Sequence, residues 1–235
     1  MTVLSVVREV CGVVGILKPT SLFAAINANR TAQEMLDNAN EMAARIGGDY
    51  RNWTMLRKST TMLGDGVAQA FAMPADYKRM LQSSHVWRST DTRQPMRFFP
   101  DTDEWLQRRA RAEYDAWGEW TIYGGQMHIA SVMGVGVSAR YSYLDKNTVA
   151  LASGGFGDRF MSDDDTYRLD ERILKLGMIW DWKAKKGSPY AEDMGTYSDA
   201  VAMAFGTDSP APVIIGSLPM SANARIAYPW TLPTP

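Results

Sequence analysis

The sequence contains very little cysteine and histidine. Its 235 residues include one cysteine, Cys11, and two histidines, His85 and His128. One cysteine excludes an intrachain disulfide and a cysteine-based zinc cluster, and two histidines are few for a metal enzyme. We therefore expect no cofactor and no metal ion.

A surplus of one charge and long apolar runs are also missing. The 25 Lys and Arg balance 26 Asp and Glu, which argues against a general nucleic-acid coat without excluding a local basic patch. The longest weakly polar runs, 129–137 and 212–218, are far shorter than the roughly 20 residues of a membrane-spanning helix. Arg8 and Glu9 interrupt the apolar start, so we expect no signal peptide, no membrane partner and a cytoplasmic setting.

Large adaptable side chains are what the sequence does contain. It has 15 Met and eight Trp, and 46% of its residues are hydrophobic. This composition predicts a real core together with broad contact surfaces inside or between subunits. The length allows one large domain or two small ones.

Apolar residues recur at helical spacing near both ends of the sequence. They predict four amphipathic helices, over residues 3–14, 31–46, 169–186 and 190–205. Thr31-Ala-Gln-Glu34 has the pattern of a capping box at the start of the second helix. Gly206 is the expected stop of the last one.

Short β-type runs fill the middle of the sequence. We expect one hairpin from 54–63 and 67–73 around Gly64-Asp65-Gly66, and a second from 120–123 and 126–129 around Gly124-Gly125. The other expected elements are a helical turn at 75–80, strands at 85–89, 96–99 and 135–144, a helix at 101–113, and an exposed glycine-rich loop at 147–165.

This order predicts an α+β fold. Helices from the two ends of the sequence form one bundle, and an antiparallel β domain is inserted between them, followed by an extended C-terminal arm. The expected units are the N-terminal helices at 1–53, the inserted β domain at 54–162, the C-terminal helices at 163–206, and the arm at 207–235.

Candidate catalytic groups all have a simpler structural interpretation. Cys11 lies on an apolar helix stripe, and the two histidines have no serine, carboxylate or further histidine at a recognised catalytic spacing. Gly154-Gly155-Phe156-Gly157 lacks the end of a phosphate loop, and Asp163-Asp164-Asp165 lacks the ligand spacing of a calcium loop. Neighbouring acids neutralise the arginines at 108, 109 and 111. We expect no catalytic site.

The arm is the anomalous segment. It carries six of the 11 prolines and is too apolar for a solvent-facing linker. Its large apolar residues are Ile214, Ile215, Leu218, Ile226, Tyr228, Trp230 and Leu232. A stiff apolar segment docks at a low entropic cost, either in a partner's groove or on its own domain.

Several segments together resemble a known family. They are Leu4–Cys11, Trp53 ahead of the expected hairpin, Met73-Pro-Ala-Asp-Tyr77, and above all the stretch from Leu169 to Tyr190 with its Leu-Gly-Met-Ile-Trp-Asp-Trp-Lys core. The sequence is similar to tailed-phage head-to-tail adaptor proteins, also called connector or tail tubular protein A-like proteins.

The resemblance implies a structural virion protein without enzymatic activity. Such proteins form a dodecameric ring in the phage neck, between the portal protein and the tail nozzle or tube, after assembly in the bacterial cytoplasm. The ring continues the channel through which DNA passes during genome ejection. The family's C-terminal segments reach the portal, which favours the arm as a portal anchor, with Tyr228, Trp230 and Leu232 as its contacts by residue type.

Two alternatives from other classes stay open. One is a tail-associated glycan hydrolase using Asp103 and Glu104, although adjacent helix residues point in different directions. The other is a β-rich module that binds a receptor or a sugar through the aromatic strand 117–123.

Overall fold

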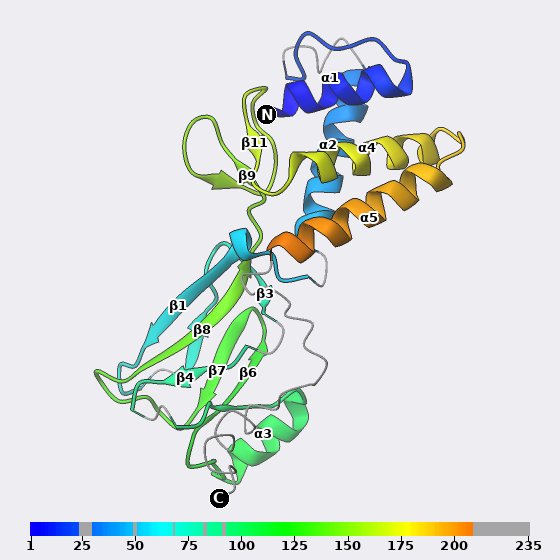
Figure 1. The fold of residues 1–235 in the computed structure, drawn as a ribbon. Helices are drawn as coiled ribbons and strands as arrows, with labels where there is room; N and C mark the ends of the chain where they lie inside the picture. Colours follow the sequence, from blue (N-terminus) through cyan, green and yellow to red (C-terminus); the bar gives the residue numbers. More distant parts are fainter. Residues whose placement is uncertain (24–29, 49–50, 68, 82–83, 91–92, 209–235) are drawn as a thin grey trace, which may run out of the picture.

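A computed structural model describes residues 1–23, 30–48, 51–67, 69–81, 84–90 and 93–208. Within them the protein is mixed α+β, as predicted. Figure 1 shows four helices at one end of an elongated molecule and the larger sheets, with one further helix, at the other. Strands β1 (Arg57–Leu63) and β8 (Ser138–Asp145) lie side by side and antiparallel, β1 running away from the helical end and β8 returning toward it.

The four predicted terminal helices are present. They are α1 (Val3–Val14), α2 (Arg30–Gly48), α4 (Glu171–Lys185) and α5 (Ala191–Asp208). Helix α4 contacts each of the other three. The valine stripe of α1, Met42 of α2 and Met178 of α4 belong to one buried cluster, as amphipathic helices with a single apolar face require.

Two helix ends differ from the prediction. Helix α2 begins at Arg30, so Thr31 lies inside the helix and is not its N-cap. Glu34 instead pairs with Arg30, at 2.9 Å, and with Lys186 at 2.8 Å. Helix α5 continues past Gly206 to Asp208, whose carboxylate accepts a 2.7 Å hydrogen bond from the backbone N–H of Thr54.

Two sheets enclose a second buried cluster, separate from that of the helices. In the first, β8 pairs with β1, β3 (Tyr77–Met80) and β4 (Trp87–Arg88). The order of the second is β2 (Ala70–Ala72), β7 (Gln126–Ala130), β6 (Glu119–Tyr123) and β5 (Arg97–Phe98). Tyr141 from the first sheet and Ile129 from the second lie in one buried cluster. The predicted helix at 101–113 is α3 (Thr102–Ala110), capped by Asp101.

Only one of the two predicted hairpins forms. Strands β6 and β7 pair around Gly124 and Gly125, whose φ angles of 59° and 73° suit a tight hairpin turn. The expected pairing of 54–63 with 67–73 is wrong. Strand β1 pairs with β8 and β2 pairs with β7, so the segment between them crosses from one sheet to the other.

Three more predictions for the middle of the chain require correction. Residues 75–80 form no helical turn, because β3 pairs with the end of β8. The strand expected at 135–144 begins at Ser138 and pairs with β1, β3 and β4. Residues 147–165 are not simply an exposed loop, since they include β9 (Val149–Ala150) and β10 (Phe156–Gly157), which form a small sheet with β11 (Thr166–Tyr167).

Asp165 holds that small-sheet region together. It is 1% exposed, and its carboxylate accepts hydrogen bonds from the backbone N–H groups of Ala152, Met161 and Ser162 at 2.6–2.8 Å. The interpretation of the acidic run as a solvated turn is therefore wrong at this residue. Tyr167 from the same region packs in the helical cluster.

Candidate functional site at the junction of helices and sheets

Strand register gathers charged residues where the sheets meet the helices. Lys58 lies opposite Tyr143 in the β1–β8 pair, and Tyr77, next to Asp76, lies opposite Asp145 in the β3–β8 pair. The chain then leaves β8 toward the helical end of the molecule, where Arg168 follows β11. Elements distant in sequence thus meet at the end of β8.

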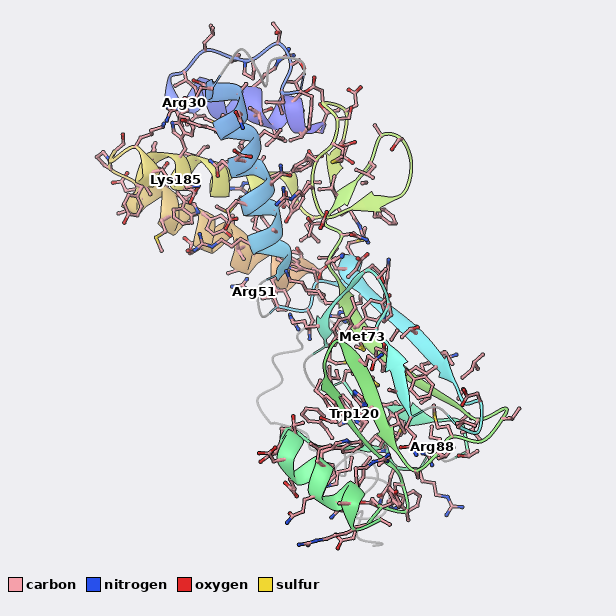
Figure 2. All side chains as sticks on the ribbon, turned by 180° about the vertical axis from the view of Figure 1, so that it is seen from behind. Arg30, Arg51, Met73, Arg88, Trp120 and Lys185 are labelled. Atoms are coloured by element: carbon pink, nitrogen blue, oxygen red, sulfur yellow. The ribbon has the colours of Figure 1, made fainter. Side chains whose placement is uncertain are left out.

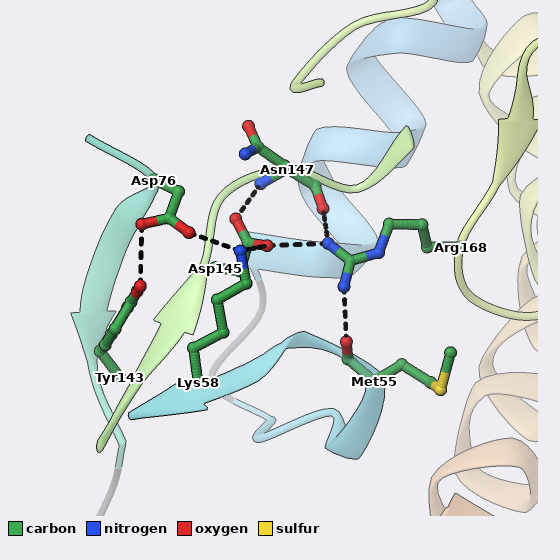
Figure 3. A network of polar contacts seen from close by, with 7 residues as sticks. All are labelled: Met55, Lys58, Asp76, Tyr143, Asp145, Asn147 and Arg168. Carbon is green, nitrogen blue, oxygen red and sulfur yellow. Dashed lines mark hydrogen bonds and ion pairs between the residues drawn. The ribbon is translucent and has the colours of Figure 1, made fainter. Parts of the chain in front are cut away.

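Asp145 is the centre of this junction network. It is 0% exposed, and its carboxylate lies 2.9 Å from the Lys58 ammonium and 2.8 Å from the Arg168 guanidinium (Figure 3). Asn147 donates its backbone N–H to the same carboxylate at 2.8 Å. A buried carboxylate is tolerated only when it is paired and hydrogen-bonded in this way.

The network extends in both directions from Asp145. Lys58 also lies 2.5 Å from Asp76, which accepts a 2.8 Å hydrogen bond from the Tyr143 hydroxyl. On the other side, Arg168 donates to the backbone carbonyls of Asn147 and Met55 (Figure 3). The Arg168 guanidinium also lies 4.1 Å from the ring centroid of Phe156, a cation–π distance.

These contacts change the proton affinities of the residues in the network. Hydrogen bonds to Asp76 and Asp145 raise the pKa of Lys58 above its usual value. Burial alone raises the pKa of Asp76, but the hydrogen bonds from Lys58 and Tyr143 outweigh it and lower that pKa. Burial and the bond to Asp76 raise the pKa of Tyr143. The charged forms of Lys58 and Asp76 are therefore favoured in the folded state.

The end of α5 is attached to the same junction. Arg51 donates to the backbone carbonyl of Val201 at 3.0 Å, and its guanidinium lies 5.4 Å from the Phe205 ring. The Trp53 ring meets Phe205 edge-on at 5.6 Å. Figure 2 shows Arg51 at the end of the helical part that faces the sheets. The residues after Asp208 therefore start beside this junction.

The candidate catalytic residues from the sequence have different surroundings in the fold. Cys11 is buried in the helical core, where burial raises the pKa of its thiol. His128 stacks on Tyr123 at 3.7 Å, and burial lowers the pKa of its imidazole. His85 lies beside Trp87, at a ring distance of 6.2 Å. Among the described residues, no three His, Cys, Asp or Glu side chains are placed to share a metal ion.

The structure also describes residues on which the two alternative functions depend. Asp103 and Glu104 lie in the exposed first turn of α3, where their backbone N–H groups donate to the Asp101 cap. In the aromatic strand, Trp120 is only 5% exposed, and its indole N–H donates to the backbone carbonyl of Met96. Trp120 therefore belongs mainly to the core of the sheets.

Helix α5 has the fewest buried residues of the helices at the helical end. Of its 18 residues only Ala200 and Val201 are buried. Met194 is 46% exposed and Met203 is 69% exposed. The two methionines are nine residues apart and so lie on opposite sides of the helix. Methionine adapts to different neighbours, so each of these exposed side chains suits contact with another protein chain.

The seven predicted arm contacts lie outside the described residues. They are Ile214, Ile215, Leu218, Ile226, Tyr228, Trp230 and Leu232. The junction network is what sequence reasoning missed. In the sequence, Asp145 directly follows the β-type run 135–144, Lys58 lies inside the run 54–63, and Asp76 lies in the expected helical turn 75–80. Charged residues are common at such positions, and their partners cannot be read from spacing.

Comparisons with known proteins found no match to a family model, and no curated protein matches the sequence. In the described part of the chain, no helix combines the length and the apolar character needed to cross a bilayer.

Proposed function

We propose that this chain is a head-to-tail adaptor subunit of a tailed phage. In this proposal twelve copies form a ring in the virion neck, bind the portal protein on one side and the tail nozzle or tube on the other, and continue the DNA channel. The helices of 1–53 and 163–206 form the bundle, 54–162 is the inserted β domain, and 207–235 is the portal-binding arm.

The observation that carries this proposal is the low burial of α5. A helix with two buried residues out of 18 and with exposed Met194 and Met203 has surface available for a neighbouring subunit. The segment with the strongest family resemblance, Leu169–Tyr190, comprises α4 and the turn into α5, so it directly precedes the exposed surface of α5 in the sequence.

Charge also supports a ring through which DNA slides. The segments of the proposed bundle, 1–53 and 163–206, together carry 11 Lys and Arg against 14 Asp and Glu. A basic lining would hold phosphates strongly, whereas an acidic or balanced surface lets the duplex pass. The proposed role is therefore mechanical and adhesive, and it uses no cofactor.

The test combines virion composition with reconstitution. Purified particles of the source phage should contain the chain in multiple copies by quantitative mass spectrometry. Electron microscopy of the full-length chain mixed with its purified portal ring should show a second ring stacked on the portal. Absence of the chain from virions would refute the proposal, and so would release of soluble sugar from cell-envelope glycan as its activity.

The arm is tested in the same reconstitution. The variant Tyr228→Ser/Trp230→Ser/Leu232→Ser should lose portal binding, because hot-spot contacts are concentrated in large aromatic and apolar side chains. The variant Leu63→Ser/Val135→Ser/Met161→Ser changes three exposed apolar side chains in the described fold and serves as the matched control. Equal binding by both variants would exclude the arm as the anchor.

A further inference from the structure

An apolar groove opens beside the junction, on the β part of the molecule. It encloses about 770 Å³, and its walls come from β3, β5 and β6 and from the segments that follow β3 and precede β5. The apolar residues of its wall include Met80, Leu81, Met96, Phe98, Trp120 and Ile122. Its volume is in the range that proteins use to hold a small ligand or a short peptide stretch.

Aromatic rings form one side of this groove. The ring centroids of Phe98 and Trp120 lie 4.6 Å apart, and Phe98 is 50% exposed. A large apolar ring therefore faces solvent next to a mostly buried one. The exposed Arg97 also lines the groove and supplies a guanidinium donor. Grooves that combine aromatic walls with a few donors bind extended, proline-containing segments, whose backbone carbonyls are free.

The groove starts close to the end of α5. Arg79, in its wall, donates to the Asn52 side chain at 3.0 Å and to the Arg51 backbone carbonyl at 2.8 Å. Two residues after Asn52, the Thr54 backbone N–H is bound to Asp208. The C-terminal segment therefore leaves the described fold within a few residues' span of the groove.

We propose that residues 213–219 of the same chain lie in this groove. This stretch, Val-Ile-Ile-Gly-Ser-Leu-Pro, is uncharged and carries four large aliphatic or proline side chains besides Val213. Four residues lie between Asp208 and Val213, and the five Cα–Cα steps from one to the other span at most about 17 Å in an extended chain. Closing such a short loop costs less entropy than docking a distant segment or a second chain.

The inference concerns one chain in solution and does not rest on the proposed function. It divides the arm into a proximal part, 213–219, which contacts its own sheets, and a distal part with Ile226, Tyr228, Trp230 and Leu232, which stays available to a partner. Docking of the distal part can fail while the proximal contact holds, so the two ideas are tested separately.

Hydrogen exchange of the full-length chain, without any partner, tests the proposal. Amides of 213–219 should exchange about tenfold more slowly than those of 226–232, because a docked segment must open before it exchanges. The variant Ile214→Ser/Ile215→Ser/Leu218→Ser should abolish this protection and expose the groove peptide 95–98. The control Tyr228→Ser/Trp230→Ser/Leu232→Ser should change neither.

A reciprocal substitution changes the groove itself. Phe98→Asp should release 213–219, whereas Leu106→Asp, at a side chain that is 51% exposed on α3, should not. Circular dichroism of both variants should match that of the unmodified chain, as the check that the fold is kept. If the amides of 213–219 exchange as fast as those of 226–232 in the unmodified chain, the proposal is wrong. Protection that disappears on dilution would overturn it too, because the segment would then come from a second copy.

Discussion

At the scale of residues, the junction depends on a carboxylate that water does not reach. The Asp145 carboxylate pairs with the cationic side chains of Lys58 and Arg168 and accepts one backbone N–H, and Lys58 also pairs with Asp76. Removing one partner from such a network leaves a buried charge uncompensated, which typically costs about 3–5 kcal/mol. The network therefore makes the junction sensitive to single substitutions and to pH.

Acid should weaken the fold through Asp76. Its pKa is lower in the folded chain than in the unfolded chain, so its stabilising effect is present above the unfolded value of about 3.9 and is lost as the pH falls through the folded value. Urea unfolding between about pH 5 and pH 2 should show the free energy of unfolding falling. Asp76→Asn should lower stability at pH 7 and flatten this fall.

The exposed Asp158 provides the matched control, since Asp158→Asn removes one carboxylate without touching the network. Its profile should follow that of the unmodified chain. If Asp76→Asn and Asp158→Asn have the same slope, the Lys58–Asp76 contact contributes nothing to the pH dependence.

No sequence pattern could have predicted this network. Lys58 and Asp145 are brought together by strand pairing, and Arg168 reaches Asp145 only after the small sheet has returned the chain to the junction. Each charge by itself is an ordinary polar residue at the end of an element. The buried Asp165 was missed for the same reason, because its three backbone donors become neighbours only in the folded loop.

At the scale of elements, Gly177 of α4 lies where side chains of α2 and α5 pack tightly against α4. A Cβ atom there would lie 2.6 Å from Cγ of Met42 and 3.1 Å from Cε2 of Tyr197, both closer than van der Waals contact allows. Gly195 on α5 has open space at the same position. These two helical glycines therefore have different roles, although both lie inside a helix.

Alanine substitution separates the two roles. Gly177→Ala should destabilise the chain by about 1–3 kcal/mol, the cost of overpacking a filled core. Gly195→Ala should stabilise it by about 0.5–1 kcal/mol, because alanine favours the helix and meets no neighbour. Chemical denaturation measures both values, and a stabilising Gly177→Ala would show that this packing is looser than described.

The four terminal helices were predicted well because their sequence signals are local. One of the two predicted hairpins was wrong. The apolar stripe of α1 repeats within 12 residues, and the Gly124-Gly125 turn joins strands that are adjacent in sequence. The pairing of β1 with β8 joins residues about 80 positions apart, so the Gly64-Asp65-Gly66 turn gave a false hairpin. Of the candidate functional regions, the sequence predicted the apolar arm, which lies outside the described residues. It did not predict the junction network.

At the scale of the whole molecule, two buried clusters are joined through the end of β8 and the attachment of α5 to Arg51, Trp53 and Thr54. The junction network lies at this connection (Figure 3). The relative orientation of the helices and the sheets should therefore depend on Arg168, which contacts the β8 carboxylate and the carbonyl of Met55 at the same time.

Spin labels can measure that orientation. Labels at Val13→Cys and Val135→Cys, which are 58% and 84% exposed on opposite parts of the molecule, should give one narrow distance distribution by pulsed electron resonance. Arg168→Met should broaden it about twofold, as expected when a buried ion pair that fixes geometry is lost. The exposed Arg159→Met is the control. An unchanged distribution in Arg168→Met would show that packing alone sets the orientation.

The central position of α4 also determines the order in which the chain can fold during synthesis. Helices α1 and α2 bury their apolar faces mainly against α4, whose last residue, Lys185, is synthesised much later. Strand β1 likewise cannot pair until β8 has been synthesised. Long-range pairings of this kind slow folding and leave apolar surface uncovered in the meantime. A nascent chain of 130 residues therefore has an exposed valine stripe and an unpaired β1 edge, and its yield in the cell depends on protection of these surfaces until α4 is made.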